Sequence, residues 1–529
     1  MGPGAFPQTL GGVLARGAAE VPDRYFVTVG GRTLSYAEFA EQVARAAGGL
    51  AGLGIGRGDK VALFLPNSLV FLLAMFAVPS LGAMFVPAHA ESAERELRYV
   101  LLHSDARAVV TDVARLPRVE AIRSEIPELK HVVVAGHPPG RPDTLTFEEL
   151  CAAMPASGAS VAPSDPAAIL YTSGTTGPPK GAVLMHRGFV LNAAAFRDHL
   201  GFGADDVLLC VLPLAHLNAQ RSSILAAAVS GAHVVVAERF SASRFWETVR
   251  EHRITAFSIL PTILAMLLAQ PSTDRDRDHS ARLCISPASP EQLRAFEARF
   301  GVHVVTTYGL TEGMLNIMNP ADCRTRRIGA VGRPIAPGVQ RVRIVDPEGR
   351  DLPAGVTGEI VLQSPAQMVG YYKDPEATAR ALRDGWLYTG DLGRLDEDGF
   401  LYFVGRLKEM IRRGGENIVP GEVEATLLMH PKVAEAVVLG VPDQIYEEAI
   451  KACVVLHPGE SPATVPPEAL FAHCAARLAP FKVPRYLEYR EELPRTPTLR
   501  VQRHLLTQVM SGENGPVFDR FAMKGESVP

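Results

Sequence analysis

The sequence predicts an α/β protein: a large N-terminal α/β domain that includes a β-rich region, followed by a small C-terminal α+β domain. Three observations indicate this class. Short runs of Val, Ile and Leu alternate with longer amphipathic stretches as far as Arg341, as in parallel sheets with helical crossovers. Turn signals then dominate, and after Arg406 helix and strand patterns mix again. The chain has 529 residues, and single cores stop growing at about 250 to 300 residues, so we expect at least two domains.

The apolar runs of the first region are expected to be strands, at residues 61–65, 108–111, 131–135, 233–237 and 302–307. Amphipathic stretches predict helices at residues 35–51 and 291–300. The glycines of residues 52–58 resemble a dinucleotide-binding fingerprint, but they follow a helix and precede a strand. That order is the reverse of the fingerprint, so these glycines are expected to form a loop.

Residues 68–88 carry no charge over a length that could span a bilayer. Pro79, Ser80 and Gly82 would interrupt a spanning helix. The segment therefore predicts a buried helix at residues 67–78 and a strand at residues 83–86, with no membrane partner.

The β-rich region is marked by turn sequences at residues 346–349 and 396–399. The small domain is expected to contain, in order, a helix at 420–429, strands at 434–440 and 449–456, a helix at 467–478 and a strand at 486–489. Residues 511–529 are polar and without pattern, which predicts a flexible tail.

Composition excludes several classes of function. Lys and Arg total 53 against 57 acidic residues, a net charge of −4, so no broad positive surface is expected for nucleic acid or anionic membrane. Six scattered cysteines without metal-ligand spacing are interpreted as reduced core residues of a cytoplasmic protein. The N-terminus lacks the pattern of a targeting segment. We expect a monomer or a homodimer.

A strand at residues 167–171 leads into a segment dense in hydroxyls and glycines, Thr172, Ser173, Gly174, Thr175, Thr176, Gly177, Pro178, Pro179, Lys180 and Gly181. Small residues leave backbone N–H groups accessible to a polyphosphate, and Lys180 adds a positive charge. The alternative is a plain surface loop. Gly181 follows the lysine where a Walker loop has Ser or Thr, so the segment is not that motif.

The segment resembles, over its whole length, the phosphate loop of AMP-forming acyl-CoA synthetases, peptide-synthetase adenylation domains and firefly-type luciferases. The resemblance covers nearly the whole chain, and residues 240–246 and 410–417 are similar to the crotonobetaine/carnitine-type CoA ligase branch. It implies an N-terminal domain of several subdomains at residues 1–405, a hinge at 406–408, a mobile C-terminal domain at 409–510 and a tail at 511–529.

Two further motifs carry this resemblance. In residues 307–312 it implies that Tyr308 stacks on adenine, Thr311 bonds the α-phosphate and Glu312 holds Mg²⁺. In residues 388–391 it implies that Asp391 accepts hydrogen bonds from the ribose, and Arg406 is then expected to reach the ribose or a phosphate. Each residue suits its expected partner: a flat ring for a base, and hard oxygens for a hard cation.

The family's reaction has two steps. A carboxylate attacks the α-phosphorus of ATP and releases pyrophosphate, and a thiol, usually that of CoA, then displaces AMP. The resemblance places Gly415 beside the pantetheine tunnel and makes His216 a candidate for the acyl site, the alternative being a histidine packed under a loop. Asn218, Gln220 and Met314 are further pocket candidates. Residues 284–290 depart from the family's pattern, which leaves the acid open.

The C-terminal signature of the family, Pro-x-Thr-x-x-Gly-Lys, is altered here. Leu499 stands in place of the glycine, and Arg500 in place of the lysine that bridges the carboxylate and the α-phosphate. Arginine keeps the charge but presents a broad planar fork instead of a compact ammonium.

Three hypotheses remain open from this change. The first is an acid–CoA ligase in which Arg500 does the lysine's work. The second is a diazotase that activates nitrite for attack by an aryl amine. The third is an adenylation-deficient pseudoenzyme. ATP and Mg²⁺ are the expected cofactors of the first two, and CoA is the expected thiol of the first.

Overall fold

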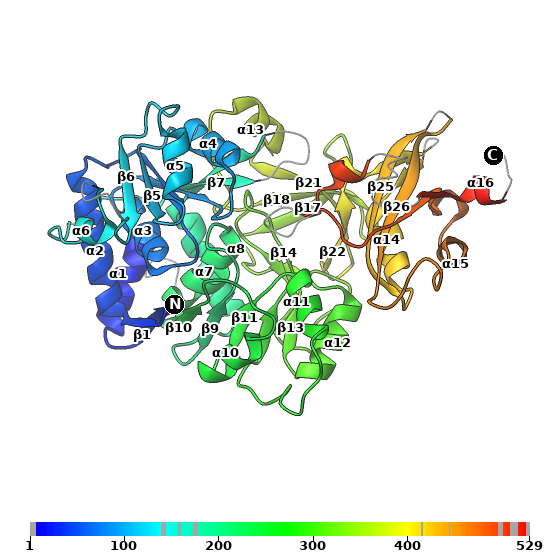
Figure 1. The fold of residues 1–529 in the computed structure, drawn as a ribbon, viewed down its shortest axis with the longest axis horizontal. Helices are drawn as coiled ribbons and strands as arrows, with labels where there is room; N and C mark the ends of the chain where they lie inside the picture. The colour runs from blue at the N-terminus through cyan, green and yellow to red at the C-terminus, as the bar shows by residue number, and fades with distance from the viewer. Residues whose placement is uncertain are drawn as a thin grey trace. The chain divides into compact units, whose positions relative to one another are not determined.

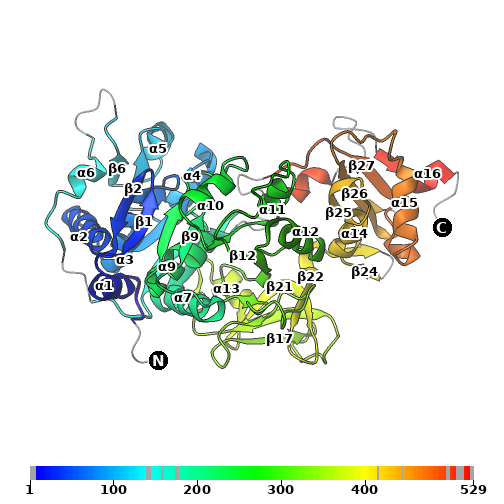
Figure 2. The same ribbon diagram turned by 90° about the horizontal axis from the view of Figure 1, so that it is seen from below.

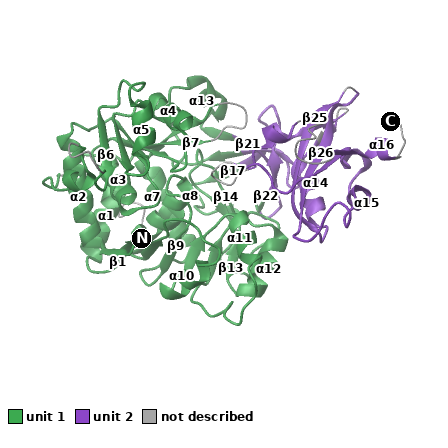
Figure 3. Ribbon diagram, in the orientation of Figure 1, with its two compact units in different colours: residues 1–342, 361–388, 399–401 green, residues 343–360, 389–398, 402–529 purple. Residues whose placement is uncertain are grey.

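The computed structural model describes residues 7–138, 144–156, 160–172, 178–413, 416–443, 445–495, 501–507 and 517–524. Within this part the chain divides into two compact units (Figure 3). Unit 1 comprises residues 1–342, 361–388 and 399–401, and unit 2 comprises residues 343–360, 389–398 and 402–529. The boundaries fall inside the β-rich region. The hinge at residues 406–408 concerns movement and stays a prediction.

One sheet of unit 1 has the order β13-β12-β11-β9-β10-β1-β2. It is parallel except at its edge, where β2 returns antiparallel to β1. Its strands are β1 (Tyr25–Val29), β2 (Arg32–Ser35), β9 (Val207–Cys210), β10 (His233–Val236), β11 (Ala256–Ser258), β12 (Leu283–Ile285) and β13 (His303–Val305). The strands predicted at 233–237 and 302–307 are confirmed as β10 and β13, the second ending earlier than predicted.

A second sheet has the order β19-β8-β7-β4-β3-β5-β6. Its strands are β3 (Lys60–Phe64), β4 (Met84–Ala88), β5 (Ala108–Asp112), β6 (His131–Ala135), β7 (Pro166–Thr172), β8 (Lys180–Met185) and β19 (Gly370–Tyr371). Strands β3 to β7 run parallel, whereas β8 is antiparallel to β7 and β19 is antiparallel to β8. A distant segment of the chain, β19, therefore lies beside β8.

Helices separate and cover these two sheets (Figures 1 and 2). Helices α3 and α7 contact strands of the second sheet, and α2 and α9 contact strands of the first. The helices of unit 1 are α1 (Leu10–Glu20), α2 (Tyr36–Gly52), α3 (Leu69–Ser80), α4 (Glu94–His103), α5 (Leu116–Arg123), α6 (Phe147–Leu150), α7 (His186–Leu200), α8 (Leu217–Ala219), the π-helix η1 (Gln220–Leu225), α9 (Ala226–Ser230), α10 (Phe245–Glu251), α11 (Pro261–Leu268), α12 (Pro290–Phe300) and α13 (Pro375–Ala381).

Helix α3 is the apolar segment that could have suggested a membrane span. Ser68 caps its first turn by accepting from the Phe71 amide, and the ring of Phe76 packs edge-on against Phe26 and Phe39. The helix continues through Pro79, two residues beyond the prediction, because a proline in the final turn removes only one backbone hydrogen bond. Across the residues with described coordinates, no helix is long and apolar enough to cross a membrane.

Shorter strands form the β-rich region. Strands β14 (Thr307–Tyr308), β15 (Ile317–Met318) and β16 (Arg333–Pro334) make one small sheet. Another has the order β17-β18-β21-β20, with β22 paired to β21. Its strands are β17 (Arg341–Val345), β18 (Gly358–Gln363), β20 (Leu382–Arg383), β21 (Trp386–Leu395) and β22 (Leu401–Arg406). The predicted turns at 346–349 and 396–399 follow β17 and β21.

The C-terminal part of unit 2 is a sheet of order β24-β23-β26-β27-β28, with β25 paired to β26. Apolar side chains of α14 and α15 pack on it. Its elements are η2 (Leu407–Glu409), β23 (Ile411–Arg413), β24 (Glu416–Ile418), α14 (Pro420–Leu428), β25 (Val433–Asp443), β26 (Glu447–Leu456), α15 (Pro467–Ala475), η3 (Pro480–Lys482), β27 (Tyr486–Tyr489), η4 (Arg503–Leu506), β28 (Val517–Asp519) and α16 (Arg520–Lys524). The predicted helices and strands of this domain are confirmed.

Two sequence expectations are corrected. The predicted tail contains a strand, β28, which pairs antiparallel with β27, because Phe518 packs on the core and Asp519 forms an ion pair with Arg485. The cysteines are free, but they are not all core residues: Cys323 is exposed and Cys151 is only partly buried. The others, Cys210, Cys284, Cys453 and Cys474, are buried.

Candidate active site

The expected phosphate loop joins two paired strands. Thr172, the last residue of β7, lies opposite Lys180, the first residue of β8, in the antiparallel register. The ends of the loop are therefore held together by the sheet. The predicted residues Ser173, Gly174, Thr175, Thr176 and Gly177 lie outside the described residues.

A polar cluster forms where β7, β8 and β19 meet the turn after β14. The Thr172 hydroxyl donates to Glu312 Oε1 at 3.2 Å, and the Tyr371 hydroxyl donates to the same oxygen at 3.0 Å. Lys180 Nζ lies 5.0 Å from the centre of the Tyr371 ring. The structure thus gathers three predicted residues, Thr172, Lys180 and Glu312, around a tyrosine that sequence reasoning missed.

Glu312 is oriented by these bonds. Burial, followed by the nearby Glu312 carboxylate, raises the pKa of Tyr371, so its hydroxyl stays protonated and remains a donor. Among the described side chains none donates to Oε2 of Glu312. No group of three or more His, Cys, Asp or Glu side chains in the described part of the chain could hold a metal by itself. A cation at Glu312 would therefore need ligands beyond this carboxylate, such as the phosphate oxygens of a bound nucleotide.

Tyr308 and Thr311 lie on the segment that leads to Glu312. Tyr308 is the second residue of β14 and is 9% exposed. Asn316 donates from Nδ2 to the Thr307 hydroxyl at 2.7 Å, which ties the segment to its return strand β15. Thr311 is partly buried in the turn that follows, next to Glu312.

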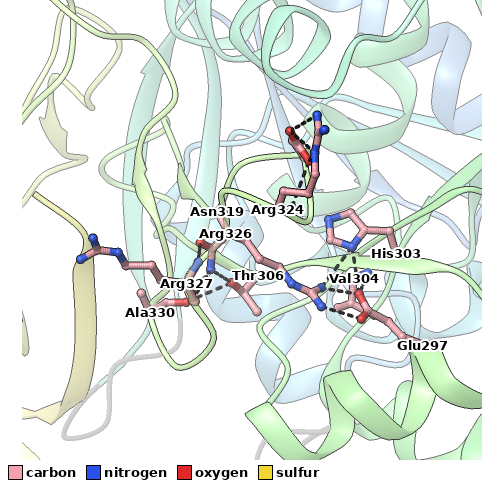
Figure 4. A network of polar contacts seen from close by, with 10 residues as sticks. Glu297, His303, Val304, Thr306, Asn319, Arg324, Arg326, Arg327 and Ala330 are labelled. Atoms are coloured by element: carbon pink, nitrogen blue, oxygen red, sulfur yellow. Dashed lines mark hydrogen bonds and ion pairs between the residues drawn. The ribbon is translucent and has the colours of Figure 1, made fainter. Parts of the chain in front are cut away.

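A network of hydrogen bonds and ion pairs fixes the strand before this segment (Figure 4). Glu297 on α12 accepts from the Val304 amide at 2.9 Å and from Arg326 Nη2 at 2.7 Å, and it also pairs with His303. Burial opposes ionisation, but the bonds from His303, Arg326 and Val304 lower the pKa of Glu297 to about 2. The carboxylate therefore stays charged at neutral pH.

Asn319, which directly follows β15, completes this network by bonding Thr306, the residue before β14. Its Nδ2 donates to the Thr306 hydroxyl at 2.6 Å and to the Ala330 carbonyl at 2.8 Å, and its Oδ1 accepts from the Arg327 amide at 3.0 Å. The network fixes the backbone at Thr306 and so sets where β14, with Thr307 and Tyr308, begins. None of its side chains could be assigned this task from the sequence.

Asp391 and Arg406, the other predicted nucleotide ligands, are neighbours in unit 2. Asp391 is 5% exposed, and Arg406 Nε lies 3.3 Å from its Oδ1. Within β21, the backbone before Asp391 is held by Glu359, which accepts from the Gly390 amide at 2.9 Å, where the positive φ of 70° suits glycine. The structure thus brings this predicted pair together.

His216 follows a segment that is held from within the core. Asn67 is buried; it accepts from the Leu214 amide at 2.7 Å and donates to the Leu212 carbonyl at 3.0 Å. The His216 ring is partly buried and lies 5.7 Å from that of His89. Sequence reasoning did not identify Asn67. A single asparagine before an apolar helix does not indicate that its side chain will hold the backbone before His216.

The C-terminal signature is described only at its edges. Arg500 and Gly415 lie outside the described residues. Of the two arginines near Arg500, Arg495 pairs with Glu435, and Arg503 donates from Nη2 to Glu424 at 2.8 Å. Both of these neighbouring arginines, the other cations that could take the place of Arg500, are therefore already engaged by carboxylates.

Comparison with known proteins agrees with these motifs. The model of the AMP-binding enzyme family matches residues 14–372, and that of the AMP-binding enzyme C-terminal domain matches residues 422–499. The chain is 38% identical to a sulfoacetate–CoA ligase of Cupriavidus necator over 505 residues, covering 94% of this chain and 96% of that protein. It is also 38% identical to a crotonobetaine/carnitine–CoA ligase of Citrobacter koseri, covering 88% and 91% of the two chains.

Solved structures agree as well. An anthranilate–CoA ligase in complex with anthranoyl-AMP superposes with a TM-score of 0.88 at 28% identity, covering 96% of this chain and 98% of the other. ATP-bound MatB from Rhodopseudomonas palustris gives a TM-score of 0.85 at 29% identity, covering 94% and 98%. With both family models matched and the Thr172, Glu312 and Asp391 motifs in order, this chain belongs to the family of AMP-binding enzymes and is an adenylate-forming ligase.

Proposed function

We propose that this ligase activates a carboxylic acid with ATP, releases pyrophosphate and transfers the acyl group from the adenylate to CoA. The observation that carries the proposal is the cluster of Thr172, Lys180, Glu312 and Tyr371, which sets an ammonium, a carboxylate and hydroxyls beside the ends of the phosphate loop. The printed names of the similar proteins, CoA ligases among them, support the same reaction.

In the first step a carboxylate oxygen of the acid forms a bond to the α-phosphorus, and the bond to pyrophosphate breaks. No protein nucleophile is needed, so catalysis consists of positioning and charge stabilisation. Tyr308 would stack on the adenine, Asp391 would accept from the ribose hydroxyls, and Lys180 and Thr311 would contact phosphate oxygens. Tyr371 and Thr172 keep the Glu312 carboxylate in one orientation.

Glu312 is the residue proposed to hold Mg²⁺. Mg²⁺ is usually bound by one or two carboxylates together with substrate phosphates, and Oε2 of Glu312 is the oxygen to which no described side chain donates. When bound, the ion would neutralise negative charge on the phosphates. Thr172 and Tyr371 would then act indirectly, by holding Oε1.

In the second step the CoA thiol attacks the carbonyl carbon of the adenylate, and AMP leaves. We propose that the C-terminal domain turns about residues 406–408 between the steps, with Gly415 then bordering the pantetheine. Arg406 would leave Asp391 or share it with the ribose, and His216 would border the acyl group. We further propose that the enzyme is cytoplasmic, since its substrates are small soluble molecules. We also propose that it works as a monomer or homodimer.

We propose that Arg500 performs the bridging task of the family's lysine. Arg495 and Arg503 are poor substitutes for it, because Glu435 and Glu424 already engage them. Neither alternative reaction is favoured by a specific observation. None of the similar proteins reported above is named for nitrite, and the anthranilate ligase, whose substrate is an aryl amine, is named as a CoA ligase. The intact Glu312 cluster gives no support to a protein that has lost adenylation.

The test is incubation of the purified chain with Mg-ATP, CoA and a panel of carboxylic acids, and separately with nitrite and aminoaryl acids. Pyrophosphate is measured and products are identified by mass. We expect pyrophosphate, AMP and an acyl-CoA with at least one acid. Pyrophosphate with nitrite alone would replace the proposal with the diazotase, and ATP binding without pyrophosphate would leave the pseudoenzyme.

A further inference from the structure

A buried arginine lies next to the adenylation motif and has no acidic partner among the described residues. Arg221, on the π-helix η1, is 7% exposed. Its Nη1 donates to the Met314 carbonyl at 2.6 Å, and its Nε, also buried, has no acceptor among the described residues. π-Helical turns are rare and occur frequently at functional sites.

Burying this charge is costly unless an anion compensates for it. Arg326 shows the ordinary solution in the same unit: its guanidinium is 13% exposed and pairs with both oxygens of Glu297 (Figure 4). Arg221 forms no ion pair with any carboxylate of the described residues. Burial lowers its pKa to about 10, so it remains positively charged at neutral pH. The compensating anion is therefore expected to come from a bound molecule.

The position of the guanidinium identifies the site it serves. Its Nη2 lies 3.2 Å from the point where a Cβ on Gly309 would stand, directly after Tyr308. Its hydrogen-bond partner Met314 follows Glu312 by two residues. The charge therefore borders the segment that carries Tyr308 and Glu312. The π-helix η1 directly continues α8, which begins just after His216, the residue assigned above to the acid.

The neighbouring side chains are also polar. Asn218 stands one turn before Arg221, and its Oδ1 accepts from Ser222 at 2.8 Å and from Ser258 at 3.1 Å. Its amide nitrogen is thereby turned away from both hydroxyls. Ser258 ends β11 and Ser286 follows β12, and the Ser286 hydroxyl is buried without a partner in the described structure. The carboxyl ends of parallel strands are the usual place for ligands in α/β proteins.

A purely structural role does not explain the charge. The Met314 carbonyl also accepts from Asn192 Nδ2 at 2.7 Å, so a neutral amide already holds it. Met314 has a positive φ of 59°, which explains why its carbonyl needs a donor but not why the donor must be charged.

We infer that the acid used by this ligase carries a second anionic group, a sulfonate or a second carboxylate, and that Arg221 receives this group while the first carboxylate is activated. The inference rests on the proposed function for the activation step. Asn218 and Ser286 supply neutral donors on the same side of the fold, so a short acid with two anionic ends is the class of substrate expected.

The test compares acids of similar length with one and two charges, namely propionate and butyrate against sulfoacetate, malonate and succinate. Wild-type kcat/KM, from pyrophosphate release, is expected to favour at least one doubly charged acid by about 100-fold. Arg221→Met should abolish this preference and change kcat/KM for the singly charged acids less than threefold. Asn192→Leu, which removes the neutral donor to Met314, is the matched control and should keep the preference.

A second readout does not depend on turnover. The doubly charged acid should raise the Tm of the wild type and of Asn192→Leu, but not that of Arg221→Met. Equal loss with every acid, or a raised KM for ATP alone in Arg221→Met, would overturn the inference and assign Arg221 to the nucleotide or to the fold. Absence of pyrophosphate with every acid would overturn the proposed function, while the thermal shift would still decide whether Arg221 binds the anion.

Discussion

The Tyr371 hydroxyl and the Glu312 carboxylate are joined by a hydrogen bond of 3.0 Å, although β19 and the turn after β14 are well separated in the sequence. The same tyrosine presents its ring to Lys180. One side chain therefore positions the predicted metal ligand and contacts the predicted phosphate ligand.

Tyr371→Phe removes the bond to Glu312 and keeps the ring. We expect KM for Mg-ATP to rise about three- to tenfold, because a hydrogen bond of this kind contributes about 0.5 to 1.5 kcal/mol. The measurement is pyrophosphate release against Mg-ATP. Tyr372→Phe is the matched control, since that hydroxyl donates to Asp105 and not to Glu312. Equal effects of the two substitutions would contradict a specific role for Tyr371.

The sequence could predict much of this cluster, but not Tyr371. Thr172, Lys180 and Glu312 were identifiable because each belongs to a motif with a fixed order of residue types. Tyr371 belongs to no such pattern, and its place depends on the pairing of β19 with β8, which is a contact between distant segments. The network around Glu297 and Asn319 escapes sequence reasoning for the same reason.

The fold was predictable where local chemistry decides it. The helix expected at residues 35–51 begins at Tyr36 because Ser35 and Glu38 form a capping box. The strand β28 was missed because Val517 to Asp519 is too short to show a period, and its pairing with β27 fixes it. Arg221 was missed although its neighbours Gln220 and Met314 were pocket candidates, since a lone arginine in a helix ordinarily points to solvent.

Arg500→Ala is expected to reduce pyrophosphate release by about 100- to 1,000-fold, because removal of one preorganised donor costs roughly 3 to 4 kcal/mol. Thioester formation from a supplied acyl-adenylate and CoA should change little, since the bridging cation is needed for the first step. Arg500→Lys distinguishes two cases: loss of activity would show an adapted arginine, and a gain would show a tolerated defect. An Arg500→Ala enzyme with full activity would refute the role.

His186 should make the protein sensitive to mild acid. It is fully buried, its Nδ1 accepts from the Leu10 amide at 3.3 Å, and burial lowers its pKa to about 4. A folded-state pKa below the unfolded value of about 6.5 means that this contribution to stability is present above pH 6.5 and is lost as the pH falls toward 4.

The measurement for His186 is the free energy of unfolding from urea titrations between pH 4 and pH 7. The wild type should lose up to about 1.4 kcal/mol per pH unit through this group. His186→Gln should flatten the slope by that amount, and substitution of the exposed His504 by Gln should not. An identical slope in His186→Gln would show that other groups cause the acid sensitivity.

Lys451 and Glu488 form an ion pair with Nζ to Oε2 at 2.6 Å and no exposure of either side chain. Glu488→Gln would remove the buried carboxylate that pairs with Lys451 and also with Arg490, so we expect about 3 to 5 kcal/mol of destabilisation. Thermal or urea unfolding of the full chain measures this. The partly exposed pair of Lys432 and Glu460 is the control, and Glu460→Gln should cost less than about 1 kcal/mol. Similar costs for both would argue against a special contribution from the buried pair.

The contact between Arg221 and the Cβ position of Gly309 has a consequence for how such enzymes can diverge. An alanine at position 309 would crowd both the guanidinium at position 221 and the side-chain amide of Asn316, because the new carbon would stand 3.2 Å from Nη2 and 3.1 Å from Asn316 Oδ1. Replacing Arg221 with a shorter residue removes one of these two close contacts, and the Asn316 amide must also shift or change before position 309 accepts a side chain. A side chain at position 309 should therefore occur among homologues only together with changes at positions 221 and 316, so a glycine at position 309 is expected wherever the buried arginine is kept.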